Sequence, residues 1–125
     1  MSANISQFTI NGERSLRISL SDIKRAVCHH FKITREEIEG PSREQIFARP
    51  RMMAMTLSRE LTPQSLPSIV KVYRRRDHTT CIHAVRRIAE LREREHRVDQ
   101  DYSNIKWAIC YPSSEVIGVG WRFAQ

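Results

Sequence analysis

The feature that most constrains the fold is a basic segment, residues 74–76, followed at once by an amphipathic helix pattern that runs to about residue 95. Asp77 can cap that helix by accepting backbone N–H groups two or three residues on. Apolar residues then recur at helical spacing and predict one buried face: Ile82, Val85, Ile88 and Leu91. A helix anchored in this way presents its polar first turn outward, beside the arginines that precede it.

The first turn of this predicted helix carries hydrogen-bonding side chains rather than plain helix formers. Thr79 and Thr80 have methyl groups that can contact thymine, and Asp77 can accept from cytosine N4. The neighbouring arginines can pair with guanine or with phosphate. Together with His78, this pattern favours insertion into the major groove of duplex DNA.

Charge and composition favour a polyanionic partner. The chain has 125 residues, of which 40% are hydrophobic, and a formal net charge of +7. This length suits one small domain with a single core. The charge favours nucleic acid over an acidic membrane surface, because no apolar run approaches the roughly 18 residues of a spanning helix. The first residues lack a secretory signal, and three widely spaced cysteines favour free thiols in a reducing cytoplasm.

Upstream of the basic segment, apolar spacing and capping residues predict shorter helices. One core helix is expected over residues 21–31. A capping box beginning at Thr34 starts a one-turn helix, which Gly40 can end. An irregular loop is expected over residues 41–47. Pro50 then suits the opening turn of a longer helix that ends before Thr62.

The next segments form a helix-turn-helix pattern. Ser65 can cap a short helix that runs to about residue 72, with a proline in its first turn. A tight turn is expected over residues 73–76, and the signature helix runs from residue 77 to about residue 95. Two helices joined by so short a turn are typical of DNA-binding modules.

Several short motifs, in this order and spacing, resemble one known family. They are Ala48-Arg49-Pro50-Arg51-Met52-Met53-Ala54-Met55, Leu61-Thr62, Ser65-Leu66-Pro67-Ser68-Ile69, and Arg76-Asp77-His78-Thr79-Thr80 with His83-Ala84 and Ile88. From about residue 20 to residue 94 the chain is similar to the C-terminal DNA-binding domain of DnaA, the bacterial chromosomal replication initiator. The resemblance implies a mainly α-helical bundle whose signature helix reads a short asymmetric duplex site of the TTATCCACA kind in the major groove.

The resemblance also implies a role for each matching residue. Base-edge contacts in the major groove are expected from Asp77, His78, Thr79, Thr80 and Arg51. Arg43, in the loop before the Pro-Arg helix, is expected in the adjacent minor groove, a narrow and electronegative groove that suits arginine. Phosphate contacts are expected from Arg59, Ser65, Leu66, Pro67, Arg76 and His83.

Three departures from the family pattern change what we expect of binding. Residues 40–45 contain Arg43 as their single cation where the family has a basic run, so we expect weaker minor-groove affinity or a different site. Met52 replaces a glutamine and cannot donate to a base or phosphate. Arg74 and Arg75 replace a Gly-Gly turn, which requires another backbone path or strain at positive φ. They also add two cations that we expect at phosphates, with a larger salt-sensitive component of binding.

Other activities lack a sequence signature. No Gly-x-x-x-x-Gly-Lys-Ser/Thr motif occurs, and the chain is expected to be too short for the initiator's ATPase module, so we expect neither cofactor nor catalysis. Neither Cys81 with His83 nor Cys28 with the two histidines after it has the paired second half of a zinc site, so no metal is expected.

The expected function is sequence-specific binding of duplex DNA by a stand-alone reader, without a membrane. It would regulate transcription or modulate replication-initiator sites at the nucleoid, in the cytoplasm of a bacterium or from a phage. The alternative is a protein-interaction adaptor that uses the same fold and a C-terminal interface.

Both ends fall outside the resemblance, and each shows strand-like alternation. Asn11-Gly12 predicts a hairpin over residues 8–18, with a loose arm as the alternative. Alternation over residues 105–111 and 117–123 predicts a short C-terminal β-hairpin, packed on the chain's own helices or forming a dimer or partner interface. The predicted organisation is an arm or hairpin at 1–19, a DNA-binding domain at 20–96 and an extension at 97–125.

Overall fold

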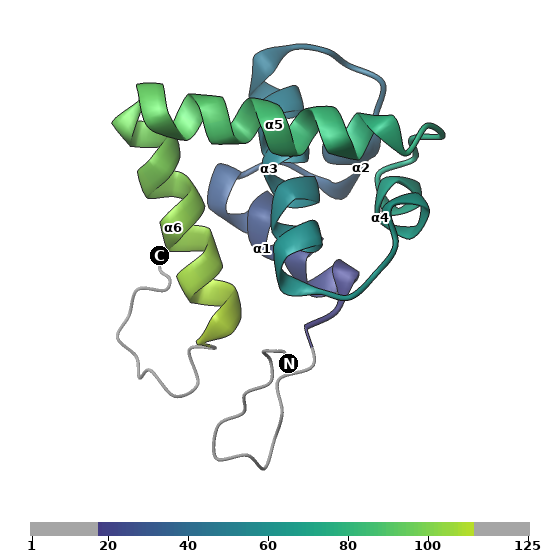
Figure 1. Ribbon diagram of the computed structural model, residues 1–125, viewed down its shortest axis with the longest axis horizontal. Helices are drawn as coiled ribbons and strands as arrows, with labels where there is room; N and C mark the ends of the chain where they lie inside the picture. The colour runs from purple at the N-terminus through teal and green to yellow at the C-terminus, as the bar shows by residue number, and fades with distance from the viewer. Residues whose placement is uncertain (1–17, 112–125) are drawn as a thin grey trace.

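Six helices make up the part of the protein that the computed structural model describes, residues 18–111 (Figure 1). In chain order they are α1 (Leu20–Phe31), α2 (Arg35–Glu39), α3 (Gln45–Leu61), α4 (Leu66–Val72), α5 (Thr79–Arg94) and α6 (His96–Cys110). The predicted mainly helical fold is confirmed. In Figure 1, α5 runs across the molecule, with α4 near its N-terminal end and α6 at its C-terminal end.

Side-chain caps start the first two helices. Ser19 accepts from the backbone N–H of Asp22, whose carboxylate accepts from the N–H of Ser19, and this capping box places the start of α1 at Leu20. Thr34 and Glu37 form the same arrangement at α2, as the sequence predicts. These reciprocal hydrogen bonds satisfy backbone donors that the first turn of a helix leaves without partners.

The start of α3 differs from the prediction. The helix begins at Gln45, so the last residues of the expected loop, 45–47, are helical, and Pro50 lies inside the helix rather than in its opening turn. The carbonyl of Glu44 accepts from the N–H groups of Phe47 and Ala48 at 2.9 and 2.7 Å, which begins the helix without a side-chain cap. Phe47 packs against the core and favours this earlier start.

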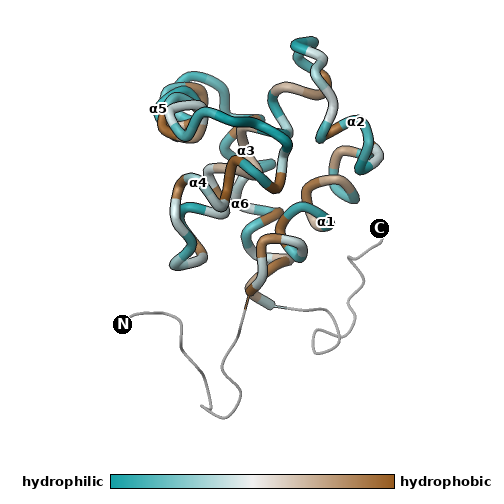
Figure 2. The backbone as a smooth tube through the Cα atoms, turned by 90° about the vertical axis from the view of Figure 1, so that its right-hand side faces the viewer, coloured by the Kyte–Doolittle hydropathy of each residue, from teal (hydrophilic) through white to brown (hydrophobic). Residues whose placement is uncertain are grey.

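The hydrophobic core surrounds α3, which contacts α1, α2, α4 and α5. Apolar parts of the tube lie toward the middle of the bundle in Figure 2. Met53 and Leu57 of α3 are fully buried, as are Ile69 of α4 and Ile88 of α5. Burial of these side chains stabilises the bundle and holds α4 and α5 against α3.

The predicted C-terminal β-hairpin is wrong where the structure describes it. All of its first strand except Tyr111 lies within α6, whose side chains Val98, Tyr102 and Ile105 are buried against α1 and α5. Tyr102 also donates a hydrogen bond to Glu60 of α3. Over a few residues, alternation of apolar side chains is compatible with either a strand or a helix. Packing against neighbouring helices selects the helix in this part of the chain. Residues 117–123 and the N-terminal segment 8–18 lie outside or largely outside the described residues.

The far side of α6 leaves two aromatic side chains exposed. Trp107 and Tyr111 have exposed fractions of 56% and 53%, and their ring centroids are 4.2 Å apart. Within residues 18–111, no helix is long and apolar enough to cross a membrane.

Candidate nucleic-acid interface

The predicted helix-turn-helix consists of α4, the residues 73–78 and α5. Ser65 caps α4 by accepting from the N–H of Ser68 at 3.3 Å. After α4, the carbonyl of Val70 accepts from the N–H groups of Tyr73 and Arg75 at 3.1 and 2.9 Å, and this reverses the chain. Arg74 has φ +59°, so the strain expected where arginine replaces glycine is present.

The start of α5 presents polar side chains outward. The carboxylate of Asp77 accepts from the N–H of Thr79 at 3.0 Å, which confirms the predicted capping contact, although the helix itself begins at Thr79. This backbone hydrogen bond lowers the pKa of Asp77, so the carboxylate stays ionised. Asp77, His78 and His83 are exposed, and Thr79 and Thr80 are partly exposed.

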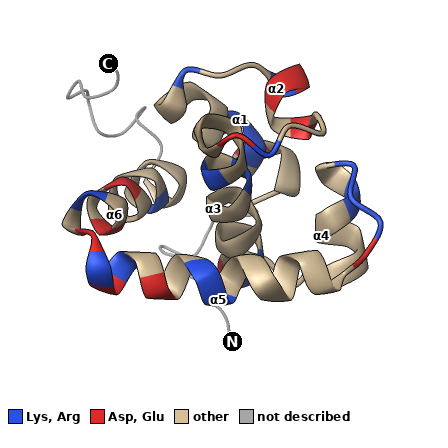
Figure 3. Ribbon diagram, turned by 90° about the horizontal axis from the view of Figure 1, so that it is seen from above, with Lys and Arg blue, Asp and Glu red and all other residues tan. Residues whose placement is uncertain are grey.

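The opposite face of α5 is anchored in the core. Cys81, Ala84, Ile88 and Leu91 are buried, whereas Ile82, which the sequence places on the buried face, is 37% exposed. The predicted face is therefore confirmed at Ile88 and Leu91, and Val85 packs against the core, whereas Cys81 and Ala84 complete the buried face in place of Ile82. The N-terminal half of α5 contains no acidic residue, and its ribbon carries no red in Figure 3; Asp77 precedes the helix in the chain.

Exposed cations lie near this first turn. Arg59, Lys71, Arg76 and Arg86 are exposed, and none of their side chains has an ion pair or hydrogen bond with another described residue. Burial raises the pKa of the Cys81 thiol, and the positive charge of Arg59 acts in the opposite direction. Arg59 therefore lies close to the start of α5. Figure 3 shows the basic segment that joins α4 to α5 in blue at the end of the molecule. Four cations are therefore available to a polyanion here.

Arg51 occupies a different position from the one expected. Its exposed fraction is 5%, and its guanidinium donates to three backbone carbonyls: Ile38 at 2.7 Å, Ser42 at 3.1 Å and Glu37 at 3.4 Å. Burial lowers its pKa to about 10. A guanidinium that is used in this way inside the fold does not reach a base edge, so the structure does not support the expected base contact.

Arg75 is also directed inward. Its Nη2 donates to the carbonyl of Gly40 at 2.7 Å, and its Nη1 donates to the carbonyls of Glu39 and Tyr73 at 3.3 and 3.0 Å. Burial lowers its pKa. The side chain expected to contact phosphate therefore joins the turn before α5 to the end of α2.

Glu39 collects three cations from separate parts of the chain. Its carboxylate forms ion pairs with Lys24 of α1, Arg35 of α2 and, at 3.1 Å, Arg74 of the turn. The Glu39 side chain is 10% exposed, and these pairs, that with Lys24 first, lower its pKa to about 2. Lys24 also donates to the carbonyl of Val72 at 3.2 Å. Arg74 is thus partly neutralised, although its side chain remains largely exposed.

The loop expected to enter the minor groove lies beside this assembly. Arg43 is exposed and has no ion pair within the described residues. Gly40, three residues earlier, is the residue that Arg75 binds, and Ser42, one residue earlier, accepts from Arg51. The structure therefore brings the backbone before Arg43 close to the turn before α5.

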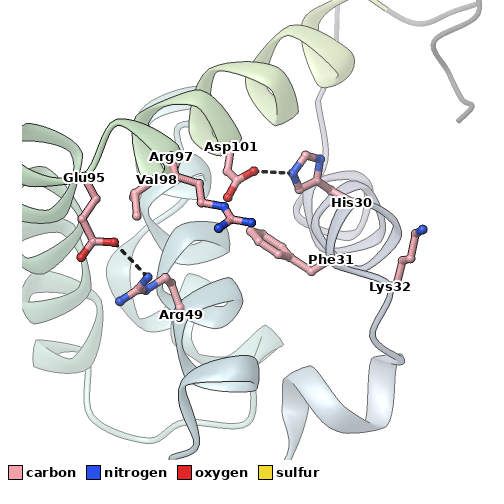
Figure 4. Close-up of a pocket in the computed structure, with 8 residues that line it drawn as sticks. All are labelled: His30, Phe31, Lys32, Arg49, Glu95, Arg97, Val98 and Asp101. Carbon is pink, nitrogen blue, oxygen red and sulfur yellow. Dashed lines mark hydrogen bonds and ion pairs between the residues drawn. The ribbon is translucent and has the colours of Figure 1, made fainter.

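A separate charged pocket lies between the end of α1, α3 and the start of α6 (Figure 4). It has a volume of about 450 Å³ and is lined by His30, Phe31, Lys32, Arg49, Glu95, Arg97, Val98 and Asp101. His30 contacts Asp101 at 2.9 Å and Arg49 pairs with Glu95 at 3.5 Å. Within residues 18–111, no group of three His, Cys, Asp or Glu side chains is placed to hold a metal ion.

Comparison with known proteins points to the same segment. The family model described as the bacterial dnaA protein helix-turn-helix matches residues 20–88. Similar proteins include the chromosomal replication initiator protein DnaA of Acinetobacter baumannii strains AYE, SDF and ACICU, each 44% identical over 92 residues. This match covers 74% of the present chain but 20% of each relative, so the chain spans about a fifth of the length of the relatives it matches.

Proposed function

The chain belongs to the family of bacterial DnaA helix-turn-helix domains, and from this premise we propose that it binds duplex DNA sequence-specifically, with α5 in the major groove. The observation that carries the proposal is the first turn of α5. This turn presents exposed hydrogen-bonding groups while the opposite face of the same helix is buried. A helix fixed from behind holds its base-reading side chains in one orientation, which sequence discrimination requires.

The proposed base contacts come from four consecutive residues. Asp77 accepts from cytosine N4, the methyl groups of Thr79 and Thr80 contact thymine, and His78 donates to a base acceptor. Exposure of these side chains supports the assignment. Phosphate contacts are assigned to Arg59, Arg74, Arg76, His83 and the residues Ser65, Leu66 and Pro67 at the start of α4.

The proposed minor-groove contact is Arg43. Its exposure and lack of an ion partner among the described residues leave its guanidinium available to a narrow groove. One arginine supplies less affinity there than a basic run, so most of the sequence preference comes from α5. The salt dependence of binding arises from the phosphate contacts.

The biological role that fits this activity is regulation of transcription or modulation of replication-initiator sites. A protein with this module occupies a DnaA-type site, or a diverged one, and competes there with other proteins. We place it at the nucleoid in the cytoplasm, and we assign it no catalytic step.

Fluorescence anisotropy with labelled duplexes tests the proposal. A DnaA-type site, a scrambled site and the sequences selected from a randomised pool are compared at two salt concentrations. We expect at least about a hundredfold preference for the selected sequence. Arg97→Ala, which removes one exposed charge at the start of α6, is the matched control for Arg76→Ala and should leave affinity nearly unchanged. Equal affinity for all duplexes, lost with salt, would refute sequence-specific binding.

An adaptor is the second candidate, because Trp107 and Tyr111 are exposed together on α6. This surface replaces the hairpin interface that the sequence predicts. Trp107→Ala should leave the DNA titration unchanged if α5 is the working surface. The adaptor function would be favoured if the wild type preferred no duplex and Trp107→Ala changed the oligomeric state.

A further inference from the structure

Two arginines from different parts of the chain hold the end of α2. Arg51 of α3 donates to the carbonyls of residues 37 and 38, at 3.4 and 2.7 Å. Arg75 of the turn donates to the carbonyls of residues 39 and 40, at 3.3 and 2.7 Å. Carbonyls at a helix C-terminus carry partial negative charge, so both guanidinium groups are stabilised there. Four consecutive carbonyls thus receive a donor from outside the helix.

The same two side chains connect the two segments assigned to DNA. Arg51 also donates to the carbonyl of Ser42 at 3.1 Å, immediately before Arg43. Arg75 precedes Arg76 and Asp77 directly, and its Nη1 also binds the carbonyl of Tyr73 at 3.0 Å. The backbone that leads to Arg43 and the backbone that leads to α5 therefore share one hydrogen-bonded assembly.

We propose that Arg75 is a positioning residue that fixes the distance between Arg43 and the first turn of α5, so that the two segments read DNA as one rigid unit. The inference rests on the proposed DNA-binding function. It assigns to Arg75 a role through the backbone of residues 39 and 40 rather than a contact with phosphate.

The electrostatic surroundings of Arg75 fit a partly buried structural arginine. The positive charge of Arg75 adds to the effect of burial in lowering the pKa of Arg51, so the two guanidinium groups lie close together. Glu39, whose carboxylate pairs with three other cations, supplies negative charge at the same end of α2. A lysine at position 75 would keep the charge but could not bind two carbonyls with a planar fork.

Arg75→Lys and Arg76→Lys are the matched pair of variants, because both keep the net charge and alter adjacent residues. Arg43→Ala identifies the base pairs that depend on Arg43, and Thr79→Ala identifies those that depend on α5. In Arg75→Lys we expect discrimination at the Arg43 base pairs to fall about fivefold, with discrimination at the α5 base pairs unchanged. Arg76→Lys, at a residue assigned to phosphate, should change the affinity for all duplexes alike and leave discrimination at both groups of base pairs unchanged.

A duplex with one base pair inserted between the two groups of base pairs provides a second test. The wild type should bind it about tenfold more weakly than the uninterrupted site, and Arg75→Lys should tolerate it better. The proposal is overturned if Arg75→Lys and Arg76→Lys weaken every duplex alike, or if the effects of Arg75→Lys and Arg43→Ala are additive at every base pair.

Hydrogen exchange of the DNA-free protein separates this inference from the proposed function. Exchange in a peptide covering residues 38–46 should be about tenfold faster in Arg75→Lys than in the wild type, and unchanged in Arg76→Lys. If the wild type prefers no duplex, the DNA-binding proposal fails, and the exchange result still shows whether Arg75 holds the loop. Unchanged exchange in Arg75→Lys would overturn the positioning role whatever the DNA result.

Discussion

Arg75 and Arg76 are neighbours with opposite uses. Arg76 is exposed and has no partner among the described residues, whereas Arg75 turns inward and donates to three carbonyls. The same contrast separates exposed Arg43 from Arg51, which is 5% exposed. Net charge alone therefore overstates the charge available to DNA. Two of the cations around the proposed interface organise the fold, and their neighbours remain available for binding.

The largest expected effect comes from removing an inward arginine. Arg51→Met should lower the free energy of unfolding by about 3 kcal/mol, because buried carbonyls at the end of α2 lose their donors. Urea denaturation followed by circular dichroism measures this loss. Arg43→Met, an exposed arginine of the adjacent loop, is the matched control and should change stability by less than about 0.5 kcal/mol. Equal losses of stability in Arg51→Met and Arg43→Met would show that the inward and the exposed arginine do not differ in their structural role.

The next effect concerns the outward groups. Thr79→Ala should reduce sequence discrimination by about 1–3 kcal/mol, because the threonine methyl and hydroxyl groups are lost at a base edge. Arg76→Ala should instead weaken all duplexes similarly and reduce the salt slope by about one. Titrations at four salt concentrations separate these two patterns. A change in sequence preference from Arg76→Ala, without a change in slope, would reassign Arg76 to a base.

Acid should weaken the assembly around Glu39. The carboxylate has its pKa lowered from 4.5 to about 2 in the folded protein, so the stability that it contributes is present above about pH 4.5 and is lost as the pH falls toward 2. We expect the ionised Glu39 carboxylate to contribute about 2 kcal/mol to the free energy of unfolding. This is less than the full pKa shift implies, because solvent screens the largely exposed partners Arg35 and Arg74.

Urea titrations at several pH values, with wild type and Glu39→Gln side by side, measure this contribution. The difference between the two proteins should be constant near neutral pH and shrink below pH 4.5. Glu93→Gln, which alters an exposed carboxylate of α5, controls for the change in net charge. A difference that persists at pH 2 would show that Glu39 acts through packing instead of charge.

The smallest effect is expected at the strained residue of the turn. Arg74→Gly should stabilise the fold by about 0.5 kcal/mol, because glycine adopts φ +59° without steric cost while the exposed ion pair with Glu39 is lost. Thermal unfolding at high salt, where that ion pair is screened, should show a larger gain. Arg76→Gly serves as the control, and it should not stabilise because Arg76 lacks a positive φ.

Local sequence patterns predicted the helix-turn-helix because the information lies within a few residues. Ser65 caps α4, the apolar residues of α4 face inward, and Asp77 accepts from the N–H of Thr79 as expected. The capping box at Thr34 likewise gives α2 its start. Such hydrogen bonds join residues two or three apart, so the sequence alone shows both partners.

Long-range packing decided what local patterns missed. The alternation of Ile105, Trp107 and Ile109 suggests a strand, yet burial of Tyr102 and Ile105 against neighbouring helices selects α6. The start of α3 is also earlier than Pro50 indicates, since Phe47 packs against the core. Neither choice can be read from residues that are adjacent in the chain.

The sequence by itself determined the module: a capped short helix, a basic turn and a helix with a polar first turn, together with the family to which they belong. Only the tertiary structure decided which arginines face solvent. Arg51 and Arg75 bind carbonyls of residues that precede them by at least nine positions, apart from the bond between Arg75 and Tyr73. The direction of a long, flexible side chain depends on which acceptors folding brings near it, and spacing along the chain does not encode that.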